Sequence, residues 1–164
     1  KESCGDCRIC IDHCPPKALS ENGFDYQACM SYFNQEKKVL TDLEISQNYS
    51  LFGCDICQMV CPKNIGKGKI IHPEFELSGK EIVSVQDLFM LSEREFREKY
   101  DQMAYLWKGK TILMRNALML LMKHRNFRDL ETIKSVDWQS KPHWFKDMYL
   151  RAIERLSMEE SLSK

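Results

Sequence analysis

The chain has 164 residues, of which 43% are hydrophobic and 29% are charged, and its 24 basic and 24 acidic residues cancel. This composition is typical of one ordinary domain or two small ones, and it excludes collagen, a chain disordered throughout and a membrane bundle. The zero net charge does not indicate a strongly basic nucleic-acid binder, although it leaves room for a local basic patch. No apolar run reaches the roughly 20 residues that span a bilayer, and the chain begins without a secretory leader, so we expect a cytoplasmic protein that does not bind a membrane.

The eight cysteines divide the chain into two parts. They are Cys4, Cys7, Cys10, Cys14, Cys29, Cys54, Cys57 and Cys61, and residues 62–164 contain none. A disulfide scaffold usually spreads its cysteines over the whole chain, so this distribution favours a metal-binding head and a separate tail. We therefore predict a cysteine-rich domain over residues 1–64, a connector over 65–83 and a helical domain over 84–164.

The cysteine spacing in the head predicts two [4Fe–4S] clusters. The first four cysteines follow the C-x2-C-x2-C-x3-C-P run of bacterial ferredoxins, in which three thiolates bind one cluster and the fourth binds the other. The second group has the same spacing and also ends in Cys-Pro but lacks its first cysteine, which Cys29 supplies. The crossed pattern assigns Cys4, Cys7, Cys10 and Cys61 to cluster 1, and Cys14, Cys29, Cys54 and Cys57 to cluster 2.

A zinc site is the alternative interpretation of the same cysteines. The pairs Cys4/Cys7 and Cys54/Cys57 would together make one Cys₄ zinc site. That site leaves four cysteines without a role and makes both Cys-Pro endings coincidences. Two clusters therefore explain more of the pattern, while zinc stays open for protein prepared in air.

The rest of the chain predicts helices. In the head we expect them at 27–33 and after Gly53. In the tail, Ser84 and Ser92 each begin a sequence like a capping box, with an acidic residue three positions on. Apolar residues recur with a helical period over 112–124, and shorter helices fit 127–136 and 142–156. Helices joined by short turns favour a HEAT-like solenoid, so we predict a mostly α protein: a small two-cluster ferredoxin-like module followed by a HEAT-like helical tail.

Several segments resemble the epoxyqueuosine reductase family, whose members use cobalamin and iron–sulfur clusters in the last step of making queuosine in tRNA. In the head they are CGDCRICIDHCPPKAL at 4–19, ACMSY at 28–32 and GCDICQMVCPKN at 53–64. In the tail they are LSEREFR at 91–97 and M-R-N-A at 114–117. The detached Cys29 and the Gly-Cys-Asp-x-Cys-Gln sequence make this resemblance more specific than the first cysteine run alone.

The resemblance implies an electron relay within a cobalamin-dependent reductase. The family carries its cobalamin domain and catalytic acid upstream of the first cysteine run, and this chain has neither. We therefore assign no catalytic residue and expect the chain alone to hold clusters without reducing epoxyqueuosine. The resemblance also implies that Ser31, Cys54 and Asp55 face the cobalamin, and that the partners are that N-terminal cobalamin domain, tRNA and an external electron donor.

Two other functions fit the same cysteines. One is the electron-transfer module of another cobalamin-dependent reductase, of the reductive-dehalogenase kind. The other is a dicluster ferredoxin-like carrier without enzymatic activity. Residues upstream of Lys1 would discriminate them, because a cobalamin domain there indicates an enzyme.

A basic stretch in the tail is the candidate tRNA contact. Residues 106–128 contain no acidic residue. Their basic residues are Lys108, Lys110, Arg115, Lys123, Arg125 and Arg128. Such a stretch in a neutral chain would meet tRNA phosphates. A solvated helix face, with Arg115 paired to an acid of the preceding helix, explains the same charges.

Overall fold

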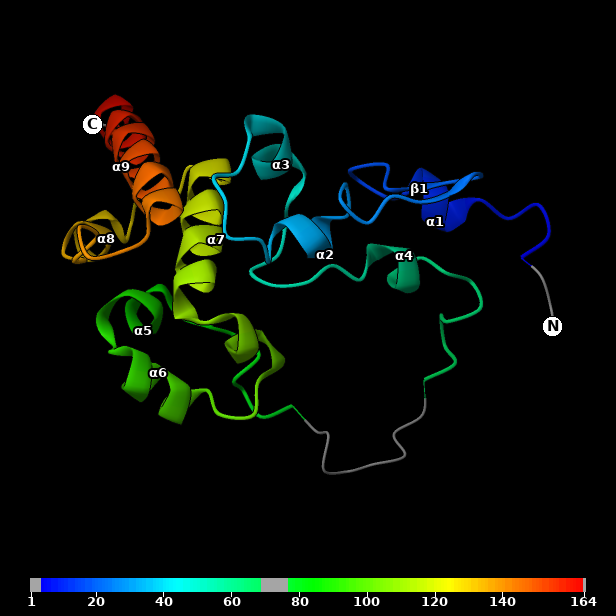
Figure 1. The fold of residues 1–164 in the computed structure, drawn as a ribbon, viewed down its shortest axis with the longest axis horizontal. Coiled ribbons are helices and arrows are strands. Elements are labelled where there is room, and N and C mark those ends of the chain that lie inside the picture. Colours follow the sequence, from blue (N-terminus) through cyan, green and yellow to red (C-terminus); the bar gives the residue numbers. More distant parts are fainter. Residues whose placement is uncertain (1–3, 69–76, 164) are drawn as a thin grey trace.

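The computed structural model describes residues 4–68 and 77–163 and is mostly helical, as predicted (Figure 1). Its elements are α1 (Ile9–Asp12), β1 (Leu19–Ser20), β2 (Gly23–Phe24), α2 (Met30–Phe33), α3 (Asp42–Gln47), α4 (Ile56–Met59), α5 (Val85–Met90), α6 (Glu93–Lys99), the 3₁₀ helix η2 (Ala104–Lys108), α7 (Lys110–Lys123), α8 (Leu130–Lys134) and α9 (His143–Leu162). The connector predicted at 65–83 lies partly outside the described residues. Figure 1 shows α1, β1 and α4 extending away from the tail helices.

Helices α5 and α6 begin where the sequence predicts. The Ser92 side chain accepts a hydrogen bond from Glu95 N, and the Glu95 carboxylate accepts one from Ser92 N, which completes a capping box at α6. At α5, Ser84 makes one of the two hydrogen bonds of a capping box, since its side chain accepts from Asp87 N. The Asp87 carboxylate instead accepts a hydrogen bond from Tyr100 Oη at 2.7 Å. The two serines therefore set both helix starts.

Three features of the head and tail differ from the prediction. Helix α3 begins with a capping box of Thr41 and Glu44, a sequence signal that we did not use. β1 and β2 pair as an antiparallel hairpin with Leu19 opposite Phe24, and Gly23 takes a φ of 135° that suits glycine there. The last two helices differ in length from the prediction, because α9 ends at Leu162 rather than 156 and α8 covers only Leu130–Lys134 of the predicted 127–136.

The hydrophobic core crosses the predicted boundary at residue 64. Helix α7 lies at its centre and packs against α9, α5 and α3. From the head, Met30, Phe33, Leu40 and Ile45 are at most 3% exposed and belong to the same cluster as the tail residues around Leu118. Much of the 28–52 segment is thus part of the tail's core, because its apolar side chains have no other core to enter.

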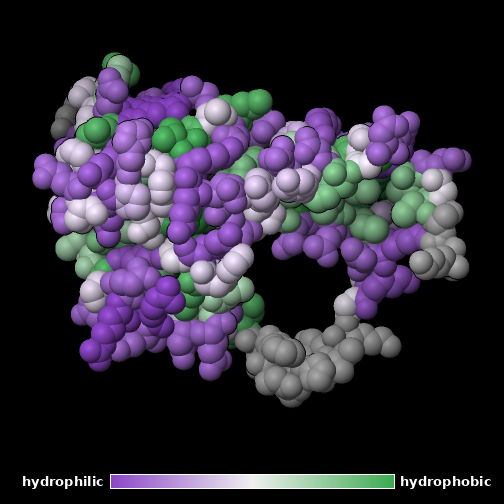
Figure 2. Space-filling model, viewed as in Figure 1, coloured by the Kyte–Doolittle hydropathy of each residue, from purple (hydrophilic) through white to green (hydrophobic). Residues whose placement is uncertain are grey.

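The surface of the head is partly apolar. Figure 2 shows hydrophobic side chains on the lobe that carries α1 and β1, among polar ones. Phe24, Tyr26, Met59 and Ile65 are each more than half exposed. Across residues 4–68 and 77–163, no helix combines the length and the apolar character that a membrane span requires.

Candidate metal centre

The two cysteine runs have the same backbone structure, 47 positions apart. Arg8 before α1 has φ −119° and ψ 6°, and Asp55 before α4 has φ −118° and ψ 14°. At the other end of each helix, Cys14 N and Cys61 N donate to the carbonyl three residues earlier, both at 3.3 Å. Helices α1 and α4 also contact each other. The three residues between Cys10 and Cys14, and those between Cys57 and Cys61, thus complete one helical turn. This turn separates the last cysteine of each run from the two cysteines before it.

Four cysteines from three segments line one cavity of about 90 Å³. They are Cys14, Cys29, Cys54 and Cys57, and the other lining residues are apolar side chains and prolines. Burial, together with the neighbouring Cys54 and Cys14, raises the pKa of the Cys57 thiol. The set that lines the cavity is the one the spacing assigns to cluster 2.

Of the remaining cysteines, Cys10 lies in α1, Cys4 and Cys7 precede α1, and Cys61 follows α4. Cys4 and Cys7 are exposed, while Cys10 and Cys61 are half-buried. Among the described residues, no three Cys, His, Asp or Glu side chains are placed to hold a single metal ion. A [4Fe–4S] cluster binds its thiolates at separate irons, and thiolates are the ligands such clusters require. The donor set, two similar runs plus Cys29, fits two such clusters.

The residues predicted to face cobalamin lie on neighbouring segments. Asn34, after α2, donates from Nδ2 to the carbonyl oxygen of Gly53 at 3.0 Å, so α2 lies beside the 53–55 loop. Ser31 and Cys54 are half-buried, and Asp55 is exposed. The three predicted residues are therefore on two adjoining elements.

Tyr49 is a cavity neighbour that the sequence prediction omitted. Its Oη lies 3.8 Å from Cys54 Sγ, to which it donates, and it accepts a hydrogen bond from Asp55 N at 3.3 Å. Burial raises the pKa of Tyr49, so the phenol keeps the proton that it donates. A lone tyrosine five residues before a cysteine carries no sequence signal for this role.

Arg115 was wrongly predicted to be a surface contact for tRNA. Its side chain is 0% exposed, and its guanidinium donates to carbonyl oxygens of the head at 2.6–2.9 Å. The alternative, an ion pair with an acid of the preceding helix, is also wrong, since these acceptors are neutral carbonyls. Burial lowers the pKa of Arg115 to about 10, which still leaves it protonated at neutral pH.

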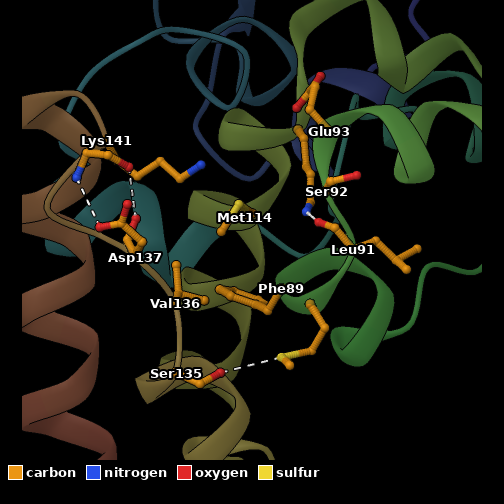
Figure 3. A pocket seen from close by; sticks show the side chains of 12 residues that line it. Phe89, Leu91, Ser92, Glu93, Met114, Ser135, Val136, Asp137 and Lys141 are labelled. Atoms are coloured by element: carbon orange, nitrogen blue, oxygen red, sulfur yellow. Dashed lines mark hydrogen bonds between the residues drawn. The ribbon is translucent and has the colours of Figure 1, made fainter.

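Lys110 is also enclosed rather than free to bind phosphate. It is 7% exposed, its Nζ donates to the Leu91 carbonyl, and it lines a cavity of about 370 Å³ between the α5–α6 turn, α7 and the loop before α9 (Figure 3). Ser135 and Met90 also line this cavity, and Ser135 Oγ donates to Met90 Sδ at 3.4 Å. The prediction of a tRNA contact at Lys110 is therefore wrong as well.

The other basic residues of the stretch do not share one face. Lys123 Nζ donates to the Asn48 carbonyl at 2.6 Å. Lys108 Nζ lies 4.2 Å from the ring centroid of the exposed Trp107, before the start of α7. Arg125 and Arg128 are exposed and line a surface hollow beyond its end. Arg125 Nε also lies 3.5 Å from Glu159 Oε1, an ion pair on the surface. Lys108 therefore lies before α7, while Arg125 and Arg128 lie beyond its end.

Comparison with known proteins agrees with this centre. Residues 3–64 match the family model described as a 4Fe-4S double cluster binding domain, which decides for clusters over zinc. An uncharacterised protein of Geobacillus stearothermophilus is 37% identical over 147 residues, covering 87% of this chain and 68% of that protein. The epoxyqueuosine reductase of Bacillus subtilis (strain 168) is 37% identical over 137 residues, covering 81% of this chain and 34% of that protein.

Solved structures of epoxyqueuosine reductase are also similar to this chain. A crystal structure of epoxyqueuosine reductase with an epoxyqueuosine-modified tRNA-Tyr stem loop superposes with a TM-score of 0.86 at 30% identity, covering 100% of this chain and 46% of that one. The chain thus spans about a third to a half of the reductases that it matches. The resemblance in the cysteine segments is confirmed, and the chain belongs to the epoxyqueuosine reductase family, of which it comprises the part with the double-cluster domain.

Proposed function

We propose that this chain is the electron-relay part of a cobalamin-dependent epoxyqueuosine reductase acting in tRNA queuosine modification. The family match and the cavity lined by Cys14, Cys29, Cys54 and Cys57 support this function. When bound, [4Fe–4S] clusters supply one-electron transfer. The reduction itself is proposed for a full-length protein, because this chain spans only part of its reductase relatives.

The proposed ligands follow the crossed pattern. Cys14, Cys29, Cys54 and Cys57 hold cluster 2, and the cavity that they line is the observation that carries the proposal. Cys4, Cys7, Cys10 and Cys61 hold cluster 1, since the contact of α1 with α4 brings the two runs together. Metal binding displaces the protons of the thiols, so cluster retention should fall as the pH is lowered.

Iron content tests this function first. We expect anaerobically reconstituted chain to bind about eight irons, four per cluster, and its absorbance near 400 nm to bleach with dithionite. The measurement is iron and zinc per chain by mass spectrometry, with sulfide assayed in parallel. Stoichiometric zinc with negligible iron after this treatment contradicts the proposal and restores the zinc interpretation.

The surface around Ser31 and Asp55 is the proposed contact with the cobalamin domain. Next to Ser31, the exposed Tyr32 packs edge-on against Tyr26 with ring centroids 5.1 Å apart. Exposed aromatic rings of this kind suit a partner with a large apolar face. Ser31, Cys54 and Asp55 therefore remain the proposed cobalamin-facing residues, and the cobalamin domain the proposed partner.

We further propose that Lys108, Arg125 and Arg128 contact tRNA phosphates. Arg125 and Arg128 are exposed, and Lys108 is half-exposed, whereas Lys123 has a backbone acceptor. Binding a phosphate at Arg125 would compete with its exposed ion pair to Glu159. Replacing the three with Ala should weaken binding of a tRNA-Tyr stem loop and reduce the slope of log K against log salt by about 0.9 per lost contact. The control replaces Arg94, Arg97 and Lys134, which removes the same charge elsewhere. If both variants bind the stem loop with the same affinity and the same salt slope, the three basic residues belong to a solvated surface and do not contact tRNA.

Finer points of architecture are part of the same proposal. The packing of α7 against α9 and α5, and of α8 against α9, supports a HEAT-like tail. We retain 1–64, 65–83 and 84–164 as sequence units, although the core joins the first to the third.

Eight free thiols suit a reducing, cytoplasmic setting with an external electron donor. Nothing in the comparisons favours a dehalogenase-like module or a carrier.

A further inference from the structure

Helix α7 carries a buried cationic side chain whose donors are all used. Arg115 Nη1 donates to the carbonyl oxygens of Glu36 and Lys38 at 2.6 and 2.9 Å. Its Nη2 donates to the Asn34 carbonyl at 2.7 Å and to Asn116 Oδ1 at 2.8 Å, and Nε donates to the same Oδ1 at 3.1 Å. The five hydrogen bonds of the guanidinium thus reach four acceptor atoms, with Asn116 Oδ1 shared by two of them, a set that suits the planar fork of an arginine.

Asn116 extends this cluster to a second segment of the head. Its Nδ2 donates to the Asn34 carbonyl at 2.8 Å and to the Leu51 carbonyl at 2.9 Å. Asn34 lies five residues after Cys29, and Leu51 lies three residues before Cys54. One amide group therefore joins the two chain segments that bring these cysteines to the cavity.

The joined segments have little structure of their own to hold them. Cys29 is the N-cap of the one-turn helix α2, and Phe33 N donates to the Cys29 carbonyl at 3.0 Å. Beyond this turn, Asn34 Nδ2 and Ser50 Oγ both donate to the Gly53 carbonyl, at 3.0 and 2.6 Å. A helix of four residues is not stable by itself, so the position of Cys29 depends on the packing of Met30 and Phe33 in the core and on what holds Asn34.

We propose that Arg115 and Asn116 are positioning residues for cluster 2. They hold the Cys29 and Cys54 segments at the separation that the cluster requires, so the tail sets the retention and the potential of cluster 2. Cluster 1 is independent of them, because α1, which carries Cys10, lies at the end of the head away from α7 (Figure 1). This inference rests on the ligand sets proposed above.

The test compares Arg115→Lys and Asn116→Asp with the wild-type chain, each reconstituted anaerobically. Lysine keeps the charge but has three donors for the four acceptor atoms, and aspartate keeps the size but sets an oxygen against two carbonyls. In both variants we expect about four of the eight irons to leave about tenfold faster to a chelator, and one of two midpoint potentials to shift. The other four irons and the other potential should match wild type.

Arg151→Lys is the matched control. Arg151 also joins tail to head, since its Nη1 donates to the Leu40 carbonyl at 3.1 Å and its Nη2 pairs with Asp42, but these acceptors are far along the chain from the cysteines. Its iron release should stay within about twofold of wild type. Far-ultraviolet circular dichroism checks that all variants keep their helices. An equal effect of Arg151→Lys, or equal loss from both clusters, overturns the proposal.

A double variant locates the effect. Adding Arg115→Lys to Cys29→Ser should change nothing further, because cluster 2 is already lost and the remaining irons do not depend on Arg115. Further loss from the remaining cluster would refute the assignment to cluster 2. Failure of the wild-type chain to bind about eight irons would refute the cluster proposal itself. Normal loading with unchanged release in Arg115→Lys would refute only the positioning role.

Discussion

Cys14→Ser is expected to remove the cluster held by Cys29, Cys54 and Cys57 and to spare the one that binds Cys4. The reason is geometric, because Cys14 lines a cavity with those three cysteines, although in sequence it ends the first run. About half of the irons should be lost, from about eight to about four per chain. Iron analysis and the electron paramagnetic resonance spectrum of the reduced protein measure this.

Paired variants decide which cluster remains. Cys14→Ser combined with Cys29→Ser should keep the same four irons as either alone, since both cysteines serve cluster 2. Cys61→Ser combined with Cys29→Ser should lose both clusters, because Cys61 serves cluster 1. If the Cys14/Cys29 pair instead loses all iron, Cys14 binds the cluster of its own run and the crossed assignment is wrong.

Removing the metal is expected to unfold part of the head while the tail survives. Residues 4–27 and 54–64 contain short turns, one hairpin and one-turn helices, and among them only Cys14 and Ala18 are buried apolar residues. Metal–thiolate bonds therefore provide most of the free energy that orders these residues. After chelation, their amides should exchange with solvent orders of magnitude faster, as measured by hydrogen exchange and mass spectrometry.

The segment between these two parts should behave like the tail. Met30, Phe33, Leu40 and Ile45 are buried in the core that α7 and α9 share, so their neighbours should stay protected without metal. From the spacing alone, we would expect all of residues 1–62 to unfold together. Uniform exchange over the whole head, before and after chelation, would show that the clusters do not order it.

The short-range features of the chain were predictable because their causes lie within a few residues. The spacing of Cys10 and Cys14 specifies one helical turn, and the Ser92–Glu95 pair specifies the start of α6. The capping box of Thr41 and Glu44 shows that α3 was also predictable, had that signal been used. The relation to the reductase family likewise follows from contiguous sequence around the cysteines.

The basic stretch shows where prediction from sequence fails. Arg115 and Arg125 belong to the same run of charge, yet one is fully buried and the other exposed. The difference comes from carbonyl oxygens of residues 34–38, which lie about 80 positions away in the chain. Burying a guanidinium requires acceptors for its donors, and nothing near Arg115 in the sequence shows that they exist.

By itself, then, the sequence determined the kind of cofactor, the starts of α5 and α6 and the family, since each depends on local spacing or contiguous motifs. Only the tertiary structure decided which cysteines share a cavity, that Met30 and Phe33 enter the core of the tail, and that Arg115 and Asn116 contact the head. These outcomes depend on contacts between distant segments, which form because buried apolar and polar groups must find partners wherever the folded chain brings them.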